Sequence, residues 1–206
     1  MHGMQAAAPA HPHRQLPTMT LPTLTTARLR LRPFTPADAP AVQRLAGARE
    51  VAATTLAIPH PYPDGAAEAW IATHAAAFAE RRAATFAVTL HAGGELIGAI
   101  GLGLAPAHAR AELGYWVGVP FWGQGYCTEA GHAMLEFGFR ELGLNRVHAH
   151  HFTHNPASGA VMRKLGMRYE GRMRQHVCKW GDLLDVDCYA ILRAEWAAAA
   201  RPASAS

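Results

Sequence analysis

The chain has few cysteines, few charged residues and no long apolar run, and each shortage excludes a class of protein. Only three of its 206 residues are cysteines, and Cys127, Cys178 and Cys188 stand far apart without a C-x-x-C pair. This spacing argues against a disulfide framework or a zinc site and favours reduced thiols. No segment approaches the ~20 apolar residues that cross a bilayer, and no secretory signal is evident. We therefore expect a cytoplasmic protein without a membrane partner.

Charge is also scarce, at 17% of the residues, with a net charge of +4. The basic residues are scattered and never form the run of about five or six that marks a nucleic-acid-binding arm, so we expect no nucleic-acid partner. Half of the residues are hydrophobic, which supports a globular protein of about one domain.

The composition divides the chain into one domain and two tails. Residues 1–22 are rich in Ala, Pro, His and Thr without a period, and residues 197–206 are similar. We predict flexible tails there and a single domain over residues 23–196. The tail histidines His2, His11 and His13 could chelate a metal, but such histidines are usually incidental.

Strand and helix patterns alternate between the tails. Leu29 and Leu31 alternate with arginines as in a half-buried strand. The later strand patterns cover residues 85–91, 95–104, 110–119, 146–154, 168–179 and 183–192. The helix patterns cover residues 36–47, 64–82, 128–142 and 155–166. In the third of these, a polar stripe is formed by Glu129, His132, Glu136 and Arg140. The predicted order is β-α-α-β-β-β-α-β-α-β-β, an α/β fold with an antiparallel meander and a locally parallel pair in a mixed sheet.

The most informative segment runs from Glu112 to Ala130, where a strand leads through Gly123 and Gly125 into a helix. Glycines let a ligand approach the backbone, and the first amides of the helix form an anion site suited to a pyrophosphate. No Gly-Lys-Ser/Thr follows, which excludes a nucleoside-triphosphate loop. The glycines at 98, 101 and 103 have the wrong spacing for a dinucleotide loop, so we predict close packing or a bulge there.

These residues resemble a known family. Residues 122–127, Trp-Gly-Gln-Gly-Tyr-Cys, are similar to the acetyl-CoA motif Gln/Arg-x-x-Gly-x-Gly/Ala of the GCN5-related N-acetyltransferases (GNAT), with Trp122 and Cys127 as departures. A second match, Asn-x-x-Ser with Lys-x-Gly downstream, lies at residues 155–166. Both resemble the branch of bacterial ribosomal-protein N-terminal (RimJ/RimL-like) acetyltransferases, over residues 24–196.

The resemblance implies a GNAT fold, with helices on both faces of the sheet, and direct transfer of an acetyl group from acetyl-CoA to a primary amine. The acceptor would be a protein or peptide N-terminus or a small-molecule amine. It further implies a monomer or a homodimer joined through the last strands. The implied cofactor-binding residues are Val117, Val119, Trp122, Gly123, Gln124, Gly125, Tyr126, Cys127, Thr128, Asn155, Ser158 and Lys164.

Glu112 is the candidate general base, because carboxylates in this position serve that role in some relatives; a surface glutamate in a salt bridge is an equal alternative. The tyrosine that protonates the leaving thiolate in many GNAT enzymes is replaced by Met162. Ser158 could hydrogen-bond the sulfur instead, or could be a simple helix residue.

Several histidines leave alternatives open. His150, His151 or His176 could help to deprotonate the amine. His148, His150 and His154 share one strand face, and two such histidines could bind zinc, but no third ligand is evident in the sequence, so we predict no metal. A catalytically silent acetyl-CoA-binding module is the competing hypothesis. Acceptor recognition is expected near residues 52–64, where alternate prolines stiffen a loop.

Overall fold

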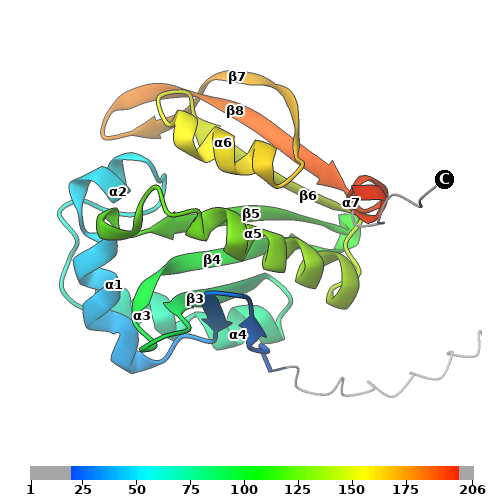
Figure 1. The fold of residues 1–206 in the computed structure, drawn as a ribbon. Helices are drawn as coiled ribbons and strands as arrows, with labels where there is room; N and C mark the ends of the chain where they lie inside the picture. Colours follow the sequence, from blue (N-terminus) through cyan, green and yellow to red (C-terminus); the bar gives the residue numbers. More distant parts are fainter. Residues whose placement is uncertain (1–19, 200–206) are drawn as a thin grey trace, which may run out of the picture.

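One eight-stranded sheet runs through residues 20–199, which are the residues that the computed structural model describes (Figure 1). Its spatial order is β1-β2-β3-β4-β5-β6-β8-β7, and every neighbouring pair is antiparallel except β5 and β6. The meander and the single parallel pair are thus confirmed. The strands are β1 (Leu24–Thr25), β2 (Leu29–Arg32), β3 (Ala83–Leu90), β4 (Leu96–Ala105), β5 (Arg110–Val117), β6 (Arg146–Phe152), β7 (Arg168–Lys179) and β8 (Asp182–Leu192).

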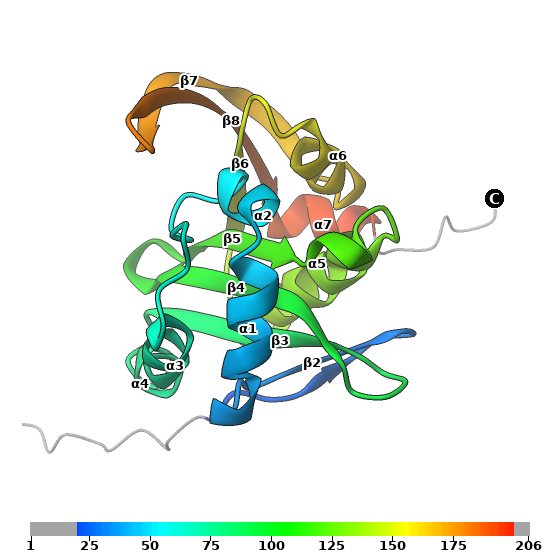
Figure 2. The ribbon, with the colours of Figure 1, turned by 90° about the vertical axis from the view of Figure 1, so that its left-hand side faces the viewer.

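Helices cover both faces of this sheet (Figure 2). The helices are α1 (Ala39–Ala46), α2 (Arg49–Ala53), α3 (Ala66–Ala72), α4 (His74–Ala79), α5 (Tyr126–Glu136), α6 (Pro156–Lys164) and α7 (Arg193–Ala199). We call the side that α1, α3 and α4 cover the α1 face, and the side that α5 and α6 cover the α5 face. A π-helical turn, Phe137–Glu141, extends α5, and a 3₁₀ turn, Pro36–Asp38, precedes α1.

Three helical segments differ from the predicted pattern. The single helix expected over residues 64–82 is two helices, α3 and α4, which meet at Thr73. The Thr73 hydroxyl donates a 2.7 Å hydrogen bond to the carbonyl of Trp70, a local bond that competes with the helical ladder. The short helix α2 lies where a loop was expected to begin, and α7 continues to Ala199, beyond the expected end of the domain at residue 196.

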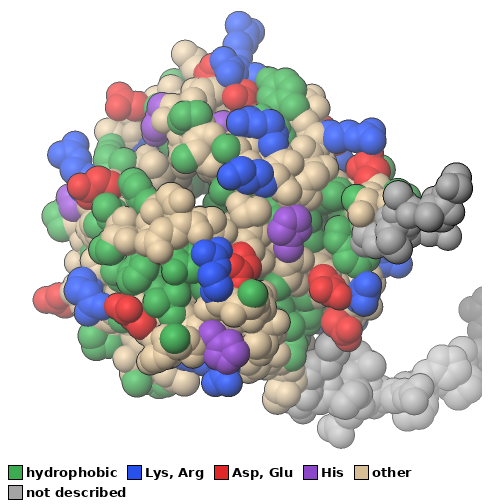
Figure 3. All heavy atoms as spheres, in the orientation of Figure 1, with side chains coloured by type: hydrophobic (Ala, Val, Ile, Leu, Met, Phe, Trp, Pro, Cys, Tyr) green, Lys and Arg blue, Asp and Glu red, His purple; other side chains and the backbone are tan. Residues whose placement is uncertain are grey.

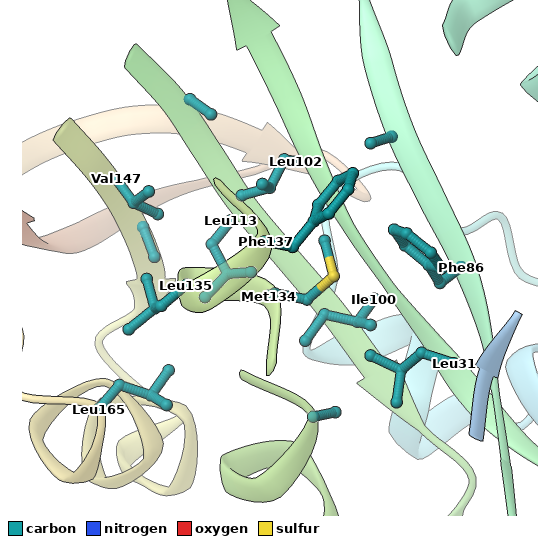
Figure 4. Close-up of a cluster of buried hydrophobic side chains, with 14 of the residues drawn as sticks. Leu31, Phe86, Ile100, Leu102, Leu113, Met134, Leu135, Phe137, Val147 and Leu165 are labelled. Atoms are coloured by element: carbon teal, nitrogen blue, oxygen red, sulfur yellow. The ribbon is translucent and has the colours of Figure 1, made fainter. Parts of the chain in front are cut away.

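The larger core lies on the α5 face (Figure 4). Met134, Leu135 and Phe137 from α5 and its extension point at strand side chains such as Phe86 and Ile100, and all five are buried. Of the predicted polar stripe, His132, Glu136 and Arg140 are exposed, while Glu129 is partly buried in a salt bridge with Arg28.

The sheet opens between β5 and β6. Only residues 110–112 of β5 pair with residues 146–148 of β6, whereas β5 follows β4 to Val117 and β6 follows β8 to Phe152. Since the amide of Gly118 donates to Ile97 on β4, alternation along the strand turns the backbone groups of Val117 away from β4 and toward this gap. A wedge-shaped gap therefore separates the two strands, and the backbone groups that face it pair with no other strand within the described residues.

Glycine explains the close packing at Gly98 on β4. A Cβ atom there would lie 2.2 Å from the carbonyl oxygen of Trp116. The pairing of β3 with β4 also shifts register between Val88 and Thr89, beside Gly98. Both predicted features, close packing and a bulge, are present.

Candidate active site

The glycine-rich loop reaches α5 through two left-handed residues. Gly123 and Gly125 have φ values of +75° and +80°, a region that side chains disfavour, and Gly125 is the N-cap of α5. The indole Nε1 of Trp122 donates a 2.6 Å hydrogen bond to the carbonyl of Val117, which fastens the loop to β5. Trp122 therefore has a local structural role that accounts for its departure from the motif, and the N–H of Val117 remains directed at the gap.

Arg28 adds a cation beside this loop. Its Nε and its backbone N–H donate to the carboxylate of Glu129 at 2.7 and 2.8 Å, and its NH1 donates to the carbonyl of Gln124 at 3.0 Å. Its guanidinium lies 4.6 Å from the ring centroid of Tyr126. Burial alone would raise the pKa of Glu129, but hydrogen bonds from Thr26 and Arg28 outweigh it and lower that pKa. The sequence did not indicate a role for Arg28, because the alternating pattern there predicts only an arginine that faces solvent from a strand.

A tyrosine and a serine meet on the α5 face of the gap. The hydroxyl of Tyr115 on β5 lies 2.8 Å from the Oγ of Ser158 and donates to the Ser158 carbonyl at 3.2 Å. Asn155 caps α6, since its Oδ1 accepts the N–H of Ser158 at 3.3 Å. Burial raises the pKa of Tyr115, so this hydroxyl stays protonated and can donate. Burial also raises the pKa of the neighbouring Cys127 thiol, to about 12.

Glu112 lies on the opposite, α1 face of β5. Its Oε1 is 3.3 Å from Nδ1 of His150 and its Oε2 is 3.9 Å from Nε2 of His148, while about half of its side chain is exposed. Burial lowers the pKa of His148, and the Glu112 carboxylate opposes this effect only in part. A carboxylate flanked by two imidazoles, one of them biased toward its neutral form, can accept and pass on a proton.

The other histidines do not join this group. His151 is buried on the α5 face, where its Nδ1 donates to the carbonyl of Phe152 at 2.8 Å, and the imidazole of His154 reaches the carbonyl of Ala53 at 3.3 Å. Within residues 20–199, no group of three or more His, Cys, Asp or Glu side chains could hold a metal ion. His2, His11 and His13 lie outside the described residues.

A single cleft of about 1050 Å³ connects these parts. It passes from the N-terminus of α5, past α6 and through the β5–β6 gap, to the α1 face, and the surface in Figure 3 is hollowed between α5 and α6. On this face of the molecule, acidic and basic side chains are interspersed (Figure 3). The predicted site residues that line the cleft are Glu112, Val117, Trp122, Gly123, Gly125, Tyr126, Cys127, Thr128, Asn155, Ser158 and Lys164. Val119 and Gln124 do not line it; the Gln124 side chain instead donates to the carbonyl of Pro120 at 3.2 Å.

Residues 28–168 match the family described as Acetyltransferase (GNAT) domain. The chain belongs to the GNAT acetyltransferases. This GNAT enzyme is an N-acetyltransferase whose acetyl donor is acetyl-CoA, and the expected GNAT superfamily and α/β fold are confirmed. It is 34% identical to the uncharacterised N-acetyltransferase YoaA of Bacillus subtilis (strain 168) over 173 residues, which are 84% of this chain and 97% of YoaA.

Two solved structures share the fold of this GNAT enzyme and differ in what they acetylate. One is RimL, a ribosomal L7/L12 α-N-protein acetyltransferase in complex with coenzyme A, with 22% identity, a TM-score of 0.75, and coverage of 81% of this chain and 95% of that one. The other is a variant of the spermidine N-acetyltransferase SpeG from Vibrio cholerae, with 20% identity, a TM-score of 0.69, and coverage of 84% and 98%. At these identities the likeness concerns the fold alone.

The loop of this GNAT enzyme between α2 and α3, residues 54–65, is held by the β7–β8 hairpin. We call it the α2–α3 loop. The ammonium of Lys179 donates to the carbonyls of Leu56 and Ile58 at 3.1 and 2.7 Å, and burial lowers its pKa. Lys179 and Arg49 also lie 5.0 and 5.7 Å from the ring centroid of Trp180. The hairpin tip thus fixes the wall of the cleft on the α1 face.

No helix of the GNAT enzyme within the described residues is long and apolar enough to cross a membrane. Its cysteines Cys127, Cys178 and Cys188 are all unpaired thiols.

Proposed function

We propose that this enzyme moves the acetyl group directly from acetyl-CoA to a primary amine, with a protein or peptide N-terminus as the first candidate acceptor and a small amine as the second. One observation carries the proposal. Glu112 and the Tyr115–Ser158 pair lie on opposite faces of β5, beside the same gap in the sheet. Donor and acceptor can therefore approach one reaction centre from opposite sides of the sheet.

The α5 face has the chemistry to hold the donor. The first-turn amides of α5 and the cation of Arg28 would receive the pyrophosphate, because a helix N-terminus favours negative charge. The extended arm would lie in the gap, against the backbone of Val117 and the amide nitrogen of Asn155, whose oxygen is taken by its cap. Lys164 adds a second cation at this end of the cleft.

The donor supplies an activated thioester, and the residues around the gap would handle charge and protons. The N–H of Val117 would donate to the carbonyl oxygen as negative charge grows on it. Glu112 would take the proton that the incoming ammonium must lose, with His150 at 3.3 Å to share or pass it on. Ser158 would donate to the departing sulfur; a thiol pKa of about 8.5 lets it leave without full protonation.

The Glu112→Gln variant tests this assignment. It keeps the size of the side chain and removes its basicity, so kcat should fall by about 10²- to 10⁴-fold while acetyl-CoA still binds. The release of free CoA thiol reports kcat, and calorimetric titration reports acetyl-CoA binding. Unchanged turnover would eliminate Glu112 as the base.

A further inference from the structure

The floor of the cleft on the α1 face is built from small residues. Cross-strand pairing places Ala83, Gly103 and Glu112 in one row and Thr85, Gly101 and Gly114 in the next. A Cβ atom built on Gly114 would meet nothing within 4 Å. Space for a substrate side group therefore opens directly beside Glu112.

The walls around this floor are apolar. The α2–α3 loop contributes the largely aliphatic run from Leu56 to Pro59, and four aromatic rings complete the enclosure. The aromatic residues are Tyr62, Trp70, Trp116 and Phe121. Trp70 is braced from outside by Phe34 and His74, whose ring centroids lie 5.1 and 4.4 Å away, so this wall is fixed. A side group that enters here exchanges water for hydrocarbon and aromatic surface.

Charge is nearly absent from the lining. Among the described residues that line the cleft, Glu112 is the sole carboxylate and Lys164 the sole Lys or Arg. Lys164 belongs to α6, on the α5 face, and is not a partner for groups on the α1 face. Of the cations near the acceptor side, Arg146 pairs with Glu170 and the ammonium of Lys179 donates to two backbone carbonyls, while Arg110 acts on His148 but does not line the cleft.

We infer that the acceptor is an amine whose only charge is the reacting ammonium and whose neighbouring group is apolar and uncharged. Glu112 can neutralise one ammonium, and the residues that line the α1 face of the cleft offer no second carboxylate for a polyamine and no Lys or Arg for a free amino acid. The imidazole of His150 on this face already lies 3.3 Å from the Glu112 carboxylate. A second charge of either sign would lose its water without gaining a partner. This inference rests on the proposed function and narrows it; the N-terminal residue of a peptide with an apolar side chain fits it.

Three amines of nearly the same shape test the inference. Norleucinamide carries one ammonium and a butyl chain, lysinamide adds a second ammonium at the end of that chain, and norleucine replaces the amide with a carboxylate. We expect kcat/KM for α-N-acetylation, corrected for the fraction of unprotonated α-amine, to be at least tenfold higher for norleucinamide than for the other two. Glycinamide, which lacks the apolar chain, should also be at least tenfold poorer.

A charge placed on the floor should shift the preference toward lysinamide. Thr85→Asp adds a carboxylate to the cleft, and Thr85→Asn is its nearly isosteric neutral control. The ratio of kcat/KM for lysinamide to kcat/KM for norleucinamide should rise at least tenfold in Thr85→Asp. In Thr85→Asn this ratio should stay at its wild-type value.

Equal or better use of lysinamide or norleucine by the wild type would overturn the inference, and so would acetyl-CoA binding without turnover of norleucinamide. Failure of the folded wild type to bind acetyl-CoA would instead overturn the proposed function, so calorimetry separates the two failures.

Discussion

The Tyr115→Phe variant removes one hydroxyl whose hydrogen-bond partner, among the described residues, is Ser158 alone. In the structure this hydroxyl lies 2.8 Å from the Ser158 Oγ and donates to the Ser158 carbonyl at 3.2 Å. Burial raises the pKa of Tyr115, so the phenol keeps its proton. When that proton points at the Ser158 Oγ, the serine hydroxyl is free to donate to the departing sulfur. Tyr115 is therefore a positioning residue that acts through Ser158.

One hydrogen bond between neutral groups contributes about 0.5–1.5 kcal/mol, which corresponds to a change in kcat of about 2- to 13-fold. We expect Tyr115→Phe to lower kcat within this range and to leave the KM for acetyl-CoA nearly unchanged. In a Ser158→Ala background, the same substitution should have little further effect, because the group that it positions is gone.

The assay is steady-state release of CoA thiol in the wild type, the two single variants and the double variant. Tyr169→Phe, on the exposed part of β7 outside the cleft, controls for the loss of a tyrosine hydroxyl. If Tyr115→Phe lowers kcat by the same factor with and without Ser158, the two residues act independently and the positioning role is refuted.

Two further predictions concern the parts that hold the site. Lys179→Met keeps an unbranched apolar stem but removes the donors to Leu56 and Ile58, so the acceptor KM should rise several-fold while the Kd of acetyl-CoA stays the same; an unchanged acceptor KM would contradict the role of the hairpin. Burial tends to raise the pKa of Asp38, but bonds from Arg32 and Thr35 outweigh it and hold that pKa below 3.8, so Asp38→Asn should cost about 2–3 kcal/mol of unfolding free energy at pH 7. A carboxyl group with a lowered pKa stabilises the fold at pH values above its unfolded pKa, and this stabilisation is lost as the pH falls through its folded pKa. The difference in unfolding free energy between the two proteins in denaturant should therefore shrink as the pH falls below 3.8. A constant difference down to about pH 2 would refute this.

Local patterns predicted most of the fold. Alternation in β2 to β6, the glycine-rich loop and the helical stripe of α5 each involve neighbours in sequence, which is why their positions were predictable. The break at Thr73 was not, because the alanine-rich sequence around it favours helix throughout and the hydroxyl bond to Trp70 leaves no periodic trace.

The site was predictable only where it is local. The loop and the first turn of α5 follow from the spacing of Gly123 and Gly125. Three other contacts join residues that lie 43 to 123 positions apart, so no local motif predicts them. They are the contacts of Arg28, the Tyr115–Ser158 pair and the contacts of Lys179. Sequence alternation placed His148 and His150 on one strand face, but the parallel pairing of β5 with β6 is what brings them to Glu112.

Calorimetric titration with acetyl-CoA tests the central claim most directly, with the wild type compared to a Gly123→Val, Gly125→Val double variant. Both glycines have positive φ, so valine strains the loop that presents the α5 amides, while the core on the α5 face is untouched. The account predicts binding in the micromolar range by the wild type, an order of magnitude typical of substrates, and its loss in a variant whose circular dichroism shows that it is folded. A folded wild type that does not bind, or a folded variant that binds as tightly, would contradict the placement of the donor on this loop.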